Sequence, residues 1–281
     1  MNLAAYRFKI YFIFILGPMV TLLFLGDIVG RIGRNSLAQI LPKLRQEYSP
    51  DLVLANGENA SGGFGLQPKQ VKEILSLGIE VITTGNHVWD KKELKPELLK
   101  PDTPVLRPAN YPKGNPGRGS TIVKLPSGLR VGVLNLMGRI FVSNVLDCPF
   151  QTASDILSHE LKALDLILVD FHAETTSEKK AMGYFLDGRV SVVLGTHTHV
   201  QTADEQILPQ GTAYITDVGM CGAYDSVLGF GAPEIIQRFQ LGSPVSFNVA
   251  KGRGHVNGIV VRLDDTTGKA IEIKRVNEIV G

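Results

Sequence analysis

Residues 190–199 read VSVVLGTHTH, an apolar run followed by a glycine and two histidines. A short apolar run rich in β-branched residues predicts a buried strand. In an extended segment, residues i and i+2 point to the same side, so His197 and His199 could converge on one point just beyond the strand. The alternative is a turn that carries two surface histidines. The rest of the chain decides between these two interpretations.

Four more apolar runs end in the same way, and a glycine precedes the polar residue in most of them. The polar residues at these ends are Asp27 after LLFLG, Glu58 and Asn59 after LVLANG, Asn86 and His87 after VITTG, and His172 after LILVDF. Ligands of open α/β sheets bind at the carboxyl ends of the strands, and glycine permits a sharp turn and a close approach there. We therefore expect these side chains to gather on one edge of a sheet.

The segments between these runs predict the fold class. Apolar spacing over residues 37–48 predicts an amphipathic helix that contains Pro42, and further helices are expected near residues 90–100, 153–164 and 177–186. Pro126, Ser127 and Gly128 predict a hairpin turn, and the last strands are expected at residues 245–249, 258–263 and 270–276. Strands that alternate with helices favour a layered α/β domain. No linker composition marks a boundary inside it.

Composition excludes several classes of protein. The chain has 281 residues, of which 44% are hydrophobic and 20% are charged, and its formal net charge is +2. This charge gives no reason to expect a polyphosphate-binding face. The two cysteines, Cys148 and Cys221, stand alone, which excludes a disulfide framework and a thiolate zinc site and suits a reducing compartment. We therefore expect a cytoplasmic protein.

The N-terminus is the one unusual stretch. Arg7 and Lys9 precede an apolar run over residues 10–25, which is similar to an export signal or a membrane anchor. The run is shorter than the roughly 20 residues of a spanning helix, and Gly17-Pro18 interrupts it. Residues 20–25 also read as the first core strand, which cleavage near Gly26 would remove. We predict a dispensable extension at residues 1–18 and a domain at residues 19–281, with no membrane partner.

The residues at the strand ends indicate a metal site. Three imidazoles, two carboxylates and two carboxamides, with no thiolate, suit iron, manganese or zinc. Seven ligands are too many for one catalytic ion that keeps open positions, but they fit two ions that share a bridging carboxylate. Two ions about 3.5–4 Å apart are the arrangement that cleaves phosphate esters. The candidate ligands are Asp27, Glu58, Asn59, Asn86, His172, His197 and His199.

In their order, GD at 26–27, GEN at 57–59, GNH at 85–87, His172 and GTHTH at 195–199 resemble the motifs of calcineurin-like metallophosphoesterases. The resemblance implies a two-sheet α/β sandwich with a binuclear metal site. Two motifs depart from that superfamily's usual pattern. The first is normally Asp-x-His but here reads Asp27-Ile28-Val29, and the second is normally Gly-Asp-x-x-Asp but here reads Gly57-Glu58-Asn59.

Both departures match one branch, the bacterial YmdB-type phosphodiesterases, which the chain resembles from about residue 20 to its end. The stretches GDIVGRIGR, NGENASGGFGL, GNHVWDKKE and DFHAETTSEK carry this resemblance. It implies two iron or manganese ions, a metal-bound hydroxide as nucleophile, and 2′,3′-cyclic nucleotides as favoured substrates. By the same resemblance, Asp27, Asn59 and His199 hold one ion, Asn86, His172 and His197 hold the other, Glu58 bridges them, and His87 is the proton donor.

Alternatives remain open from the residues alone. The same metal site could serve a phosphomonoesterase, such as a nucleotidase or protein phosphatase. The chain could also be a regulatory module that senses nucleotides or RNA-derived ends and turns over slowly, and a homo-oligomer is a further expectation. Among the other candidates, His159 is expected to be solvated, His255 to lie in a surface loop, and Trp89 to serve packing rather than base stacking.

Overall fold

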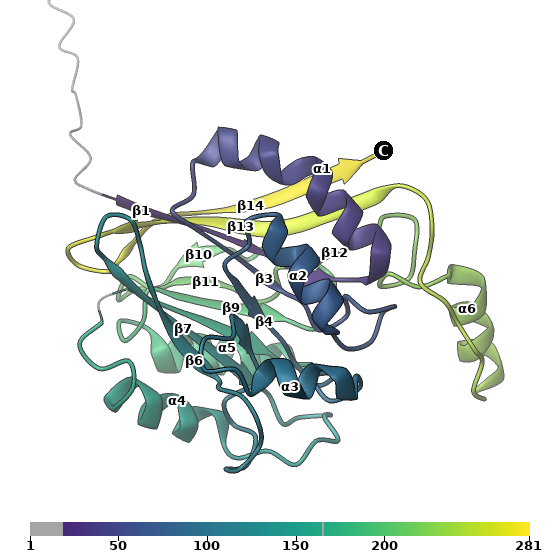
Figure 1. The fold of residues 1–281 in the computed structure, drawn as a ribbon, viewed down its shortest axis with the longest axis horizontal. Helices are drawn as coiled ribbons and strands as arrows, with labels where there is room; N and C mark the ends of the chain where they lie inside the picture. Colours follow the sequence, from purple (N-terminus) through teal and green to yellow (C-terminus); the bar gives the residue numbers. More distant parts are fainter. Residues whose placement is uncertain (1–18, 165) are drawn as a thin grey trace, which may run out of the picture.

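The computed structural model describes residues 19–164 and 166–281 (Figure 1). The predicted extension at residues 1–18 lies outside the described residues. In the described part of the chain, no helix combines the length and the apolar character that crossing a membrane requires.

The strands form two sheets. The first sheet has the order β2 (Asp27–Ile28), β12 (Met220–Ala223), β13 (Gly254–Asp264), β1 (Met19–Leu25), β3 (Leu52–Asn56), β4 (Val81–Thr83) and β5 (Val105–Leu106), and β14 (Ala270–Val280) also pairs with β13. The second has the order β10 (Gln206–Ile207), β11 (Ala213–Ile215), β9 (Val192–Thr196), β8 (Leu166–His172), β7 (Arg130–Met137) and β6 (Ser120–Lys124).

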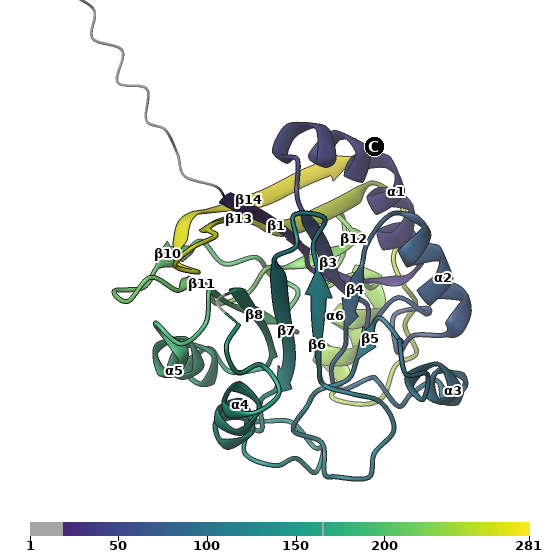
Figure 2. The same cartoon turned by 60° about the vertical axis from the view of Figure 1, so that its left-hand side comes forward.

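The two sheets pack face to face because their strands are apolar on both sides. In β1, Leu22 and Phe24 face the second sheet, whereas Leu23 and Leu25 belong to a separate core under the helices. Helices α1 (Gly30–Tyr48) and α2 (Pro68–Ser76) cover the first sheet, and α4 (Pro149–Ser158) and α5 (Thr176–Leu186) cover the second. Figure 2 shows α1 and α2 on one side and α4 and α5 on the other, with strands between them. The predicted two-sheet α/β sandwich is confirmed.

The parallel strands bring the predicted ligands to one edge. Strands β1, β3 and β4 run parallel in the first sheet, and β7, β8 and β9 run parallel in the second. The carboxyl ends of parallel strands meet at one edge of a sheet, so the residues that follow β1, β3, β4, β8 and β9 lie near one another.

Several predicted elements differ in the structure. The helix expected near residues 90–100 is a 3₁₀ turn (Lys92–Leu94) followed by the short α3 (Lys95–Leu98). Pro96 lacks an N–H, so it fits only the first turn of a helix. The helix expected near residues 153–164 ends at Ser158, and the hairpin flanking Gly128 is confirmed as β6 and β7.

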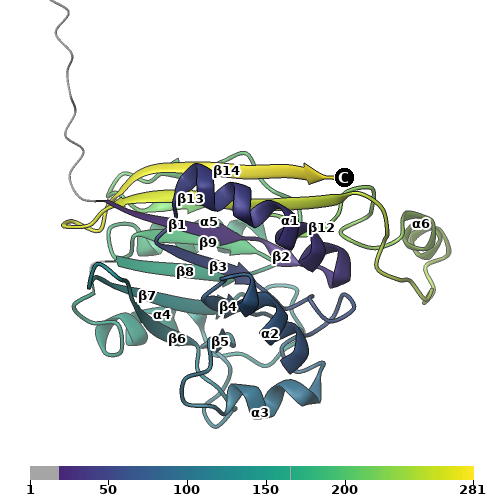
Figure 3. The same cartoon turned by 45° about the horizontal axis from the view of Figure 1, so that its top comes forward.

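The C-terminal part departs further from the sequence prediction. The prediction of a strand at residues 245–249 is wrong. Within this segment only Val249 forms a bridge, an isolated one to Phe230. The alternating segment packs through its side chains instead, since the ring of Phe247 lies edge-on to those of Phe64 and Phe230, with centroids 6.1 and 5.0 Å apart. His255 lies inside β13 rather than in a surface loop. Helix α6 (Ala232–Leu241) was not predicted, and Figure 3 shows it standing clear of the sheets at one end of the molecule.

Candidate metal centre

The predicted ligands follow the strand ends, as expected. Asp27 begins β2, and Glu58 and Asn59 lie in the turn after β3. Asn86 follows β4, and His172 is the last residue of β8. The turn after β4 needs a glycine, because a Cβ at Gly85 would collide with the imidazole of His172 and with a carboxylate oxygen of Glu58. The glycine thus lets the backbone approach the cluster closely.

The centre is a cluster around Nε2 of His172. This atom has three neighbours at 3.0 Å: Oε1 of Glu58, Oδ1 of Asn86 and Nδ1 of His197. Ligand atoms of Glu58, His172 and His197 all lie within 4.8 Å of one another. One proton on Nε2 can point to only one of the three acceptors. A cation among these atoms would satisfy all of them, so the residues fit a metal ion.

A second group lies beside the first. Nε2 of His199 lies 3.2 Å from Oδ1 of Asn59 and 4.0 Å from Oδ1 of Asp27. Asp27 is fully buried, and its Oδ1 has no hydrogen-bond partner among the described residues. An unpaired buried carboxylate oxygen is costly unless a cation balances it. Burial, together with the charges of Glu58, Asp217 and Asp170, raises the pKa of Asp27 well above its ordinary value, although His172 opposes this.

The three imidazoles are oriented so that one nitrogen of each is free to face the cluster. Thr196 Oγ1 donates to Asp170 Oδ1 at 2.7 Å, so it must accept from Nδ1 of His172 at 2.8 Å. Nδ1 of His199 can only donate to the carbonyl oxygen of Leu228, at 3.0 Å. Hydrogen bonds of this kind to the outer nitrogen fix the tautomer that binds a metal.

His197 is oriented by a residue that the sequence analysis missed. Its Nε2 lies 3.0 Å from a carboxylate oxygen of Glu174, which leaves Nδ1 facing His172. Burial and the neighbouring His172 lower the pKa of His197 to about 3, so its ring is neutral, as a metal ligand must be. Glu174 follows β8 by two residues, but its sequence position gave no signal, because its contact with His197 is formed only by the fold.

Charges within the cluster attract a cation. Burial acts to lower the pKa of His172, but the carboxylates of Glu58, Asp27 and Asp170 raise it to about 9. Burial acts to raise the pKa of Glu58, but His172 and the other histidines lower it to about 2. At neutral pH Nε2 of His172 therefore carries a proton, which a metal ion bound at this point would displace.

The backbone of the GTHTH motif is not extended at its histidines. β9 ends at Thr196, and φ is 99° at His197 and 62° at His199, in the left-handed region. Alternation along a strand is therefore not what brings them together. Their rings separate, with His197 directed to His172 and His199 to Asn59. The two imidazoles belong to two neighbouring groups of ligands.

Such left-handed residues cost of order 1–3 kcal/mol each and persist only where the surroundings hold them. Between the two histidines, the N–H and the hydroxyl of Thr198 donate to Oδ2 of Asp217, at 3.1 and 2.7 Å. Nζ of Lys179 donates to the same oxygen at 2.6 Å, and both charged side chains are buried. The ion pair of Lys179 and Asp217 therefore stabilises the turn that contains His197 and His199.

His87 lies beside the cluster but is held differently. Its N–H donates to Oε2 of Glu58 at 3.3 Å, while its Nδ1 lies 2.7 Å from a carboxylate oxygen of Asp90. The ring packs edge-on against Phe64, with centroids 5.1 Å apart, and its side chain is partly exposed. Asp90 orients the ring so that Nε2 is available to the cavity.

A cavity of about 420 Å³ opens beside the cluster. Its polar end is lined by Glu58, Asn59, His87, Glu174, His197 and His199. The other end is mainly apolar, and its lining side chains are those of Val227, Leu228, Phe230, Ile235, Phe239 and Phe247, with Arg238 among them. Trp89 lies outside this cavity and packs against Tyr111, with ring centroids 5.4 Å apart, as predicted. His159 is exposed, also as predicted.

The two-sheet sandwich with this cluster at its strand ends defines the fold class, that of the calcineurin-like metallophosphoesterases. The fold is similar to that of a phosphatase from Mycoplasma pneumoniae, with a TM-score of 0.87 and 36% identity over 94% of this chain and 95% of that one. It is also similar to a hypothetical protein from Thermus thermophilus, with a TM-score of 0.86 and 38% identity over 93% of this chain and all of that one.

Residues 23–276 match the YmdB-like protein family, and the chain belongs to that family. It is 48% identical over 255 residues to the 2′,3′-cyclic-nucleotide 2′-phosphodiesterase of Bacillus subtilis. The match covers 91% of this chain and 96% of that relative. The family resemblance carried by the sequence motifs is thus confirmed.

Proposed function

We propose that this chain is a metal-dependent phosphodiesterase that hydrolyses 2′,3′-cyclic nucleotides, with two iron or manganese ions in the cluster. The observation that carries the proposal is the arrangement of His172, His197 and His199, each with one nitrogen held from outside and the other directed at the ligand cluster. The named activity of the relative from Bacillus subtilis supports the choice of substrate.

The contacts support the division of ligands into two sets. His199, Asn59 and Asp27 lie together, and His172, Asn86 and His197 form the other group. We assign Glu58 as the bridge because a carboxylate has two oxygens that can bind different ions. Two bound ions would supply Lewis acidity and an activated water at phosphorus.

His87 is assigned as the proton donor to the leaving oxygen. It lines the cavity, and Asp90 orients its ring through Nδ1. Seven other side chains are available to hold metal, so the site does not need His87 as a ligand. Its backbone N–H contact with Glu58 keeps it next to the reacting phosphate.

Metal analysis of the purified protein, combined with a panel of substrates, tests the proposed function. We expect two iron or manganese ions per chain and metal-dependent hydrolysis of 2′,3′-cyclic nucleotides and of activated diesters. Faster turnover of monoesters would make the chain a phosphomonoesterase. Nucleotide binding without turnover would make it a sensing module. A metal content of one ion would contradict the binuclear assignment.

We also propose that residues 1–18 are dispensable and that the protein acts in the cytoplasm. The family match begins at residue 23, and both cysteines are free. A chain that begins at Met19 should therefore fold and keep the metal content and kcat/KM of the full chain. Recovery of the full chain in a membrane fraction, or failure of the shorter chain to fold, would contradict this proposal.

A further inference from the structure

The cavity beside the cluster has an apolar wall that the proposed chemistry does not use. The wall combines Val227, Leu228 and Phe230 with Ile235 and Phe239 of α6, and with Phe247 after the helix. It is continuous with the polar end, since the same cavity is lined by His87, His197 and His199. A molecule bound with its phosphate at the polar end would therefore place its remainder against apolar side chains.

Three phenylalanine rings that line the cavity pack against one another, those of Phe64, Phe230 and Phe247. Phe64 stacks on Phe230, with centroids 5.2 Å apart, and Phe247 meets both rings edge-on at 6.1 and 5.0 Å. The guanidinium of Arg238 lies over the ring of Phe247, 5.4 Å from its centroid. These rings form a rigid base, and Phe64 connects it to the ring of His87.

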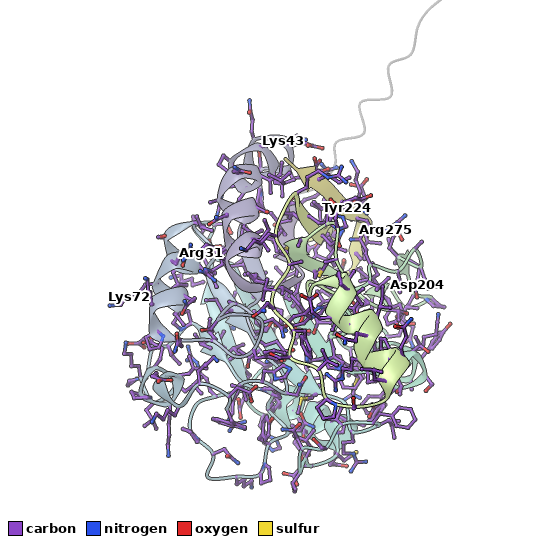
Figure 4. All side chains as sticks on the ribbon, turned by 90° about the vertical axis from the view of Figure 1, so that its right-hand side faces the viewer. Arg31, Lys43, Lys72, Asp204, Tyr224 and Arg275 are labelled. Atoms are coloured by element: carbon purple, nitrogen blue, oxygen red, sulfur yellow. The ribbon has the colours of Figure 1, made fainter. Side chains whose placement is uncertain are left out.

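Phe239 differs from those three rings. It lines the same cavity, yet it is 81% exposed and has no ring or cation partner among the described residues. Helix α6 carries it, and this helix stands apart from the two sheets (Figure 3). Figure 4 looks onto this end of the molecule, with α6 in front. Ile236 and Leu241 of the same helix are also exposed, and a group of exposed apolar side chains beside a cavity is typical of a binding surface.

We propose that the segment from Val227 to Phe247 is the nucleobase subsite, in which the base of a nucleotide stacks on Phe239 while its phosphate lies at the metal cluster. This inference rests on the proposed function, because it needs a nucleotide phosphate at the polar end. A cavity of about 420 Å³ is within the size range of small-ligand sites, which combine apolar walls with a few polar groups. Aromatic side chains stack on any base, since every base has a π-face.

The test compares two substrates that differ only in the base. One is adenosine 2′,3′-cyclic phosphate, and the other is methyl β-ribofuranoside 2′,3′-cyclic phosphate, which keeps the cyclic diester and the sugar. Loss of one base–aromatic stack corresponds to a change of about 5- to 140-fold. In metal-loaded Phe239→Ala, the ratio of kcat/KM for the adenosine substrate to that for the baseless one should fall by this factor. The change should lie mainly in KM, because stacking binds substrate and transition state alike.

Two further variants are the controls. Phe239→Trp keeps an aromatic face and should restore the ratio. Ile236→Ala removes another exposed apolar side chain of α6 that does not line the cavity, so the ratio should stay at the value of the unaltered protein. An equal loss on both substrates in Phe239→Ala, or an unchanged ratio, would overturn the subsite.

The remaining outcomes separate the subsite from the proposed function. If the unaltered protein hydrolyses both substrates equally well, the subsite is wrong and the phosphodiesterase function stands. If it hydrolyses neither, the proposed function itself fails. If Phe239→Ala and Ile236→Ala both convert an oligomer to a monomer in light scattering, with the substrate ratio unchanged, the apolar face of α6 is an interface between copies of the chain.

Discussion

The two ends of the active-site cavity are built in opposite ways. At the metal end, Asp27, Glu58 and His172 are buried, and hydrogen bonds from outside the cluster fix the histidine rings. At the other end, α6 stands apart from the sheets and exposes Phe239. The buried end must hold charges in one geometry, and this requires the support of a rigid sheet edge. Among the described residues, the apolar end has no buried charges to hold in place, so a helix that stands apart from the sheets can form it.

The largest effect is expected at Glu58. Its oxygens contact His172 Nε2 and the N–H of His87, which places it between the proposed metal ligands and the proposed proton donor. If Glu58 bridges two ions as proposed, Glu58→Ala should lose both metals and, with them, all measurable activity. Metal-to-protein ratios after purification give the measurement.

Asn59→Ala is the matched control for the bridge. Among the proposed ligands, the side chain of Asn59 contacts His199, on one side of the cluster. Its loss should therefore weaken the binding of one ion and leave the other bound. Retention of two ions per chain in Glu58→Ala would show that another residue bridges them.

The next largest effect is expected at His87. A general acid typically contributes about 10²–10⁴-fold to the rate. His87→Gln should lose activity on cyclic nucleotides within this range. It should keep both metals, because the His87 ring contacts Asp90 and Phe64 and none of the proposed metal ligands. The loss should be smaller for a p-nitrophenyl diester, whose leaving group needs little protonation. Loss of metal, or equal losses on both substrates, would remove His87 from the role of donor.

The candidate ligands at the strand ends could be predicted from the sequence, because the carboxyl ends of parallel strands meet at one edge of a sheet irrespective of loop structure. The residues that orient the ligands could not. Glu174 reaches His197, and Thr196 links His172 to Asp170, only after the chain has folded. Alternation along a strand does not bring His197 and His199 to the cluster, since both adopt positive φ after β9 ends.

The apolar end was missed for a different reason. Residues 245–249 alternate as a strand does, but in the structure Phe247 packs on Phe64 and Phe230, and only Val249 forms a bridge. Helix α6 lies between Gly231 and Gly242 and has Pro233 in its first turn. Proline at this position is a sequence signal for the start of a helix. Local patterns thus identify the strand ends but not the segment that covers the cavity.

A smaller effect than that of His87 is expected at Glu174, a positioning residue. Groups that orient a metal ligand typically contribute about 10- to 100-fold to metal affinity or activity. Glu174→Ala should weaken the ion held by His197 within this range, measured as the dissociation constant of the more weakly bound metal. Glu174→Gln keeps an oxygen acceptor for the ring and should recover most of the affinity. An unchanged dissociation constant in Glu174→Ala would mean that the contact with His197 orients nothing.

The smallest effect concerns stability at the apolar end, and it tests whether the two ends differ as described. Phe239 is 81% exposed, so Phe239→Ala should change the free energy of unfolding by less than about 0.5 kcal/mol, as substitutions at exposed sites usually do. Phe24 is the matched control, because it is 1% exposed between the two sheets, and Phe24→Ala should cost about 3–5 kcal/mol. Urea unfolding of the metal-free chains gives both values without a contribution from bound ions. A loss in Phe239→Ala that approaches the loss in Phe24→Ala would show that α6 is part of the core, and the exposed phenylalanine would then need no nucleobase to explain it.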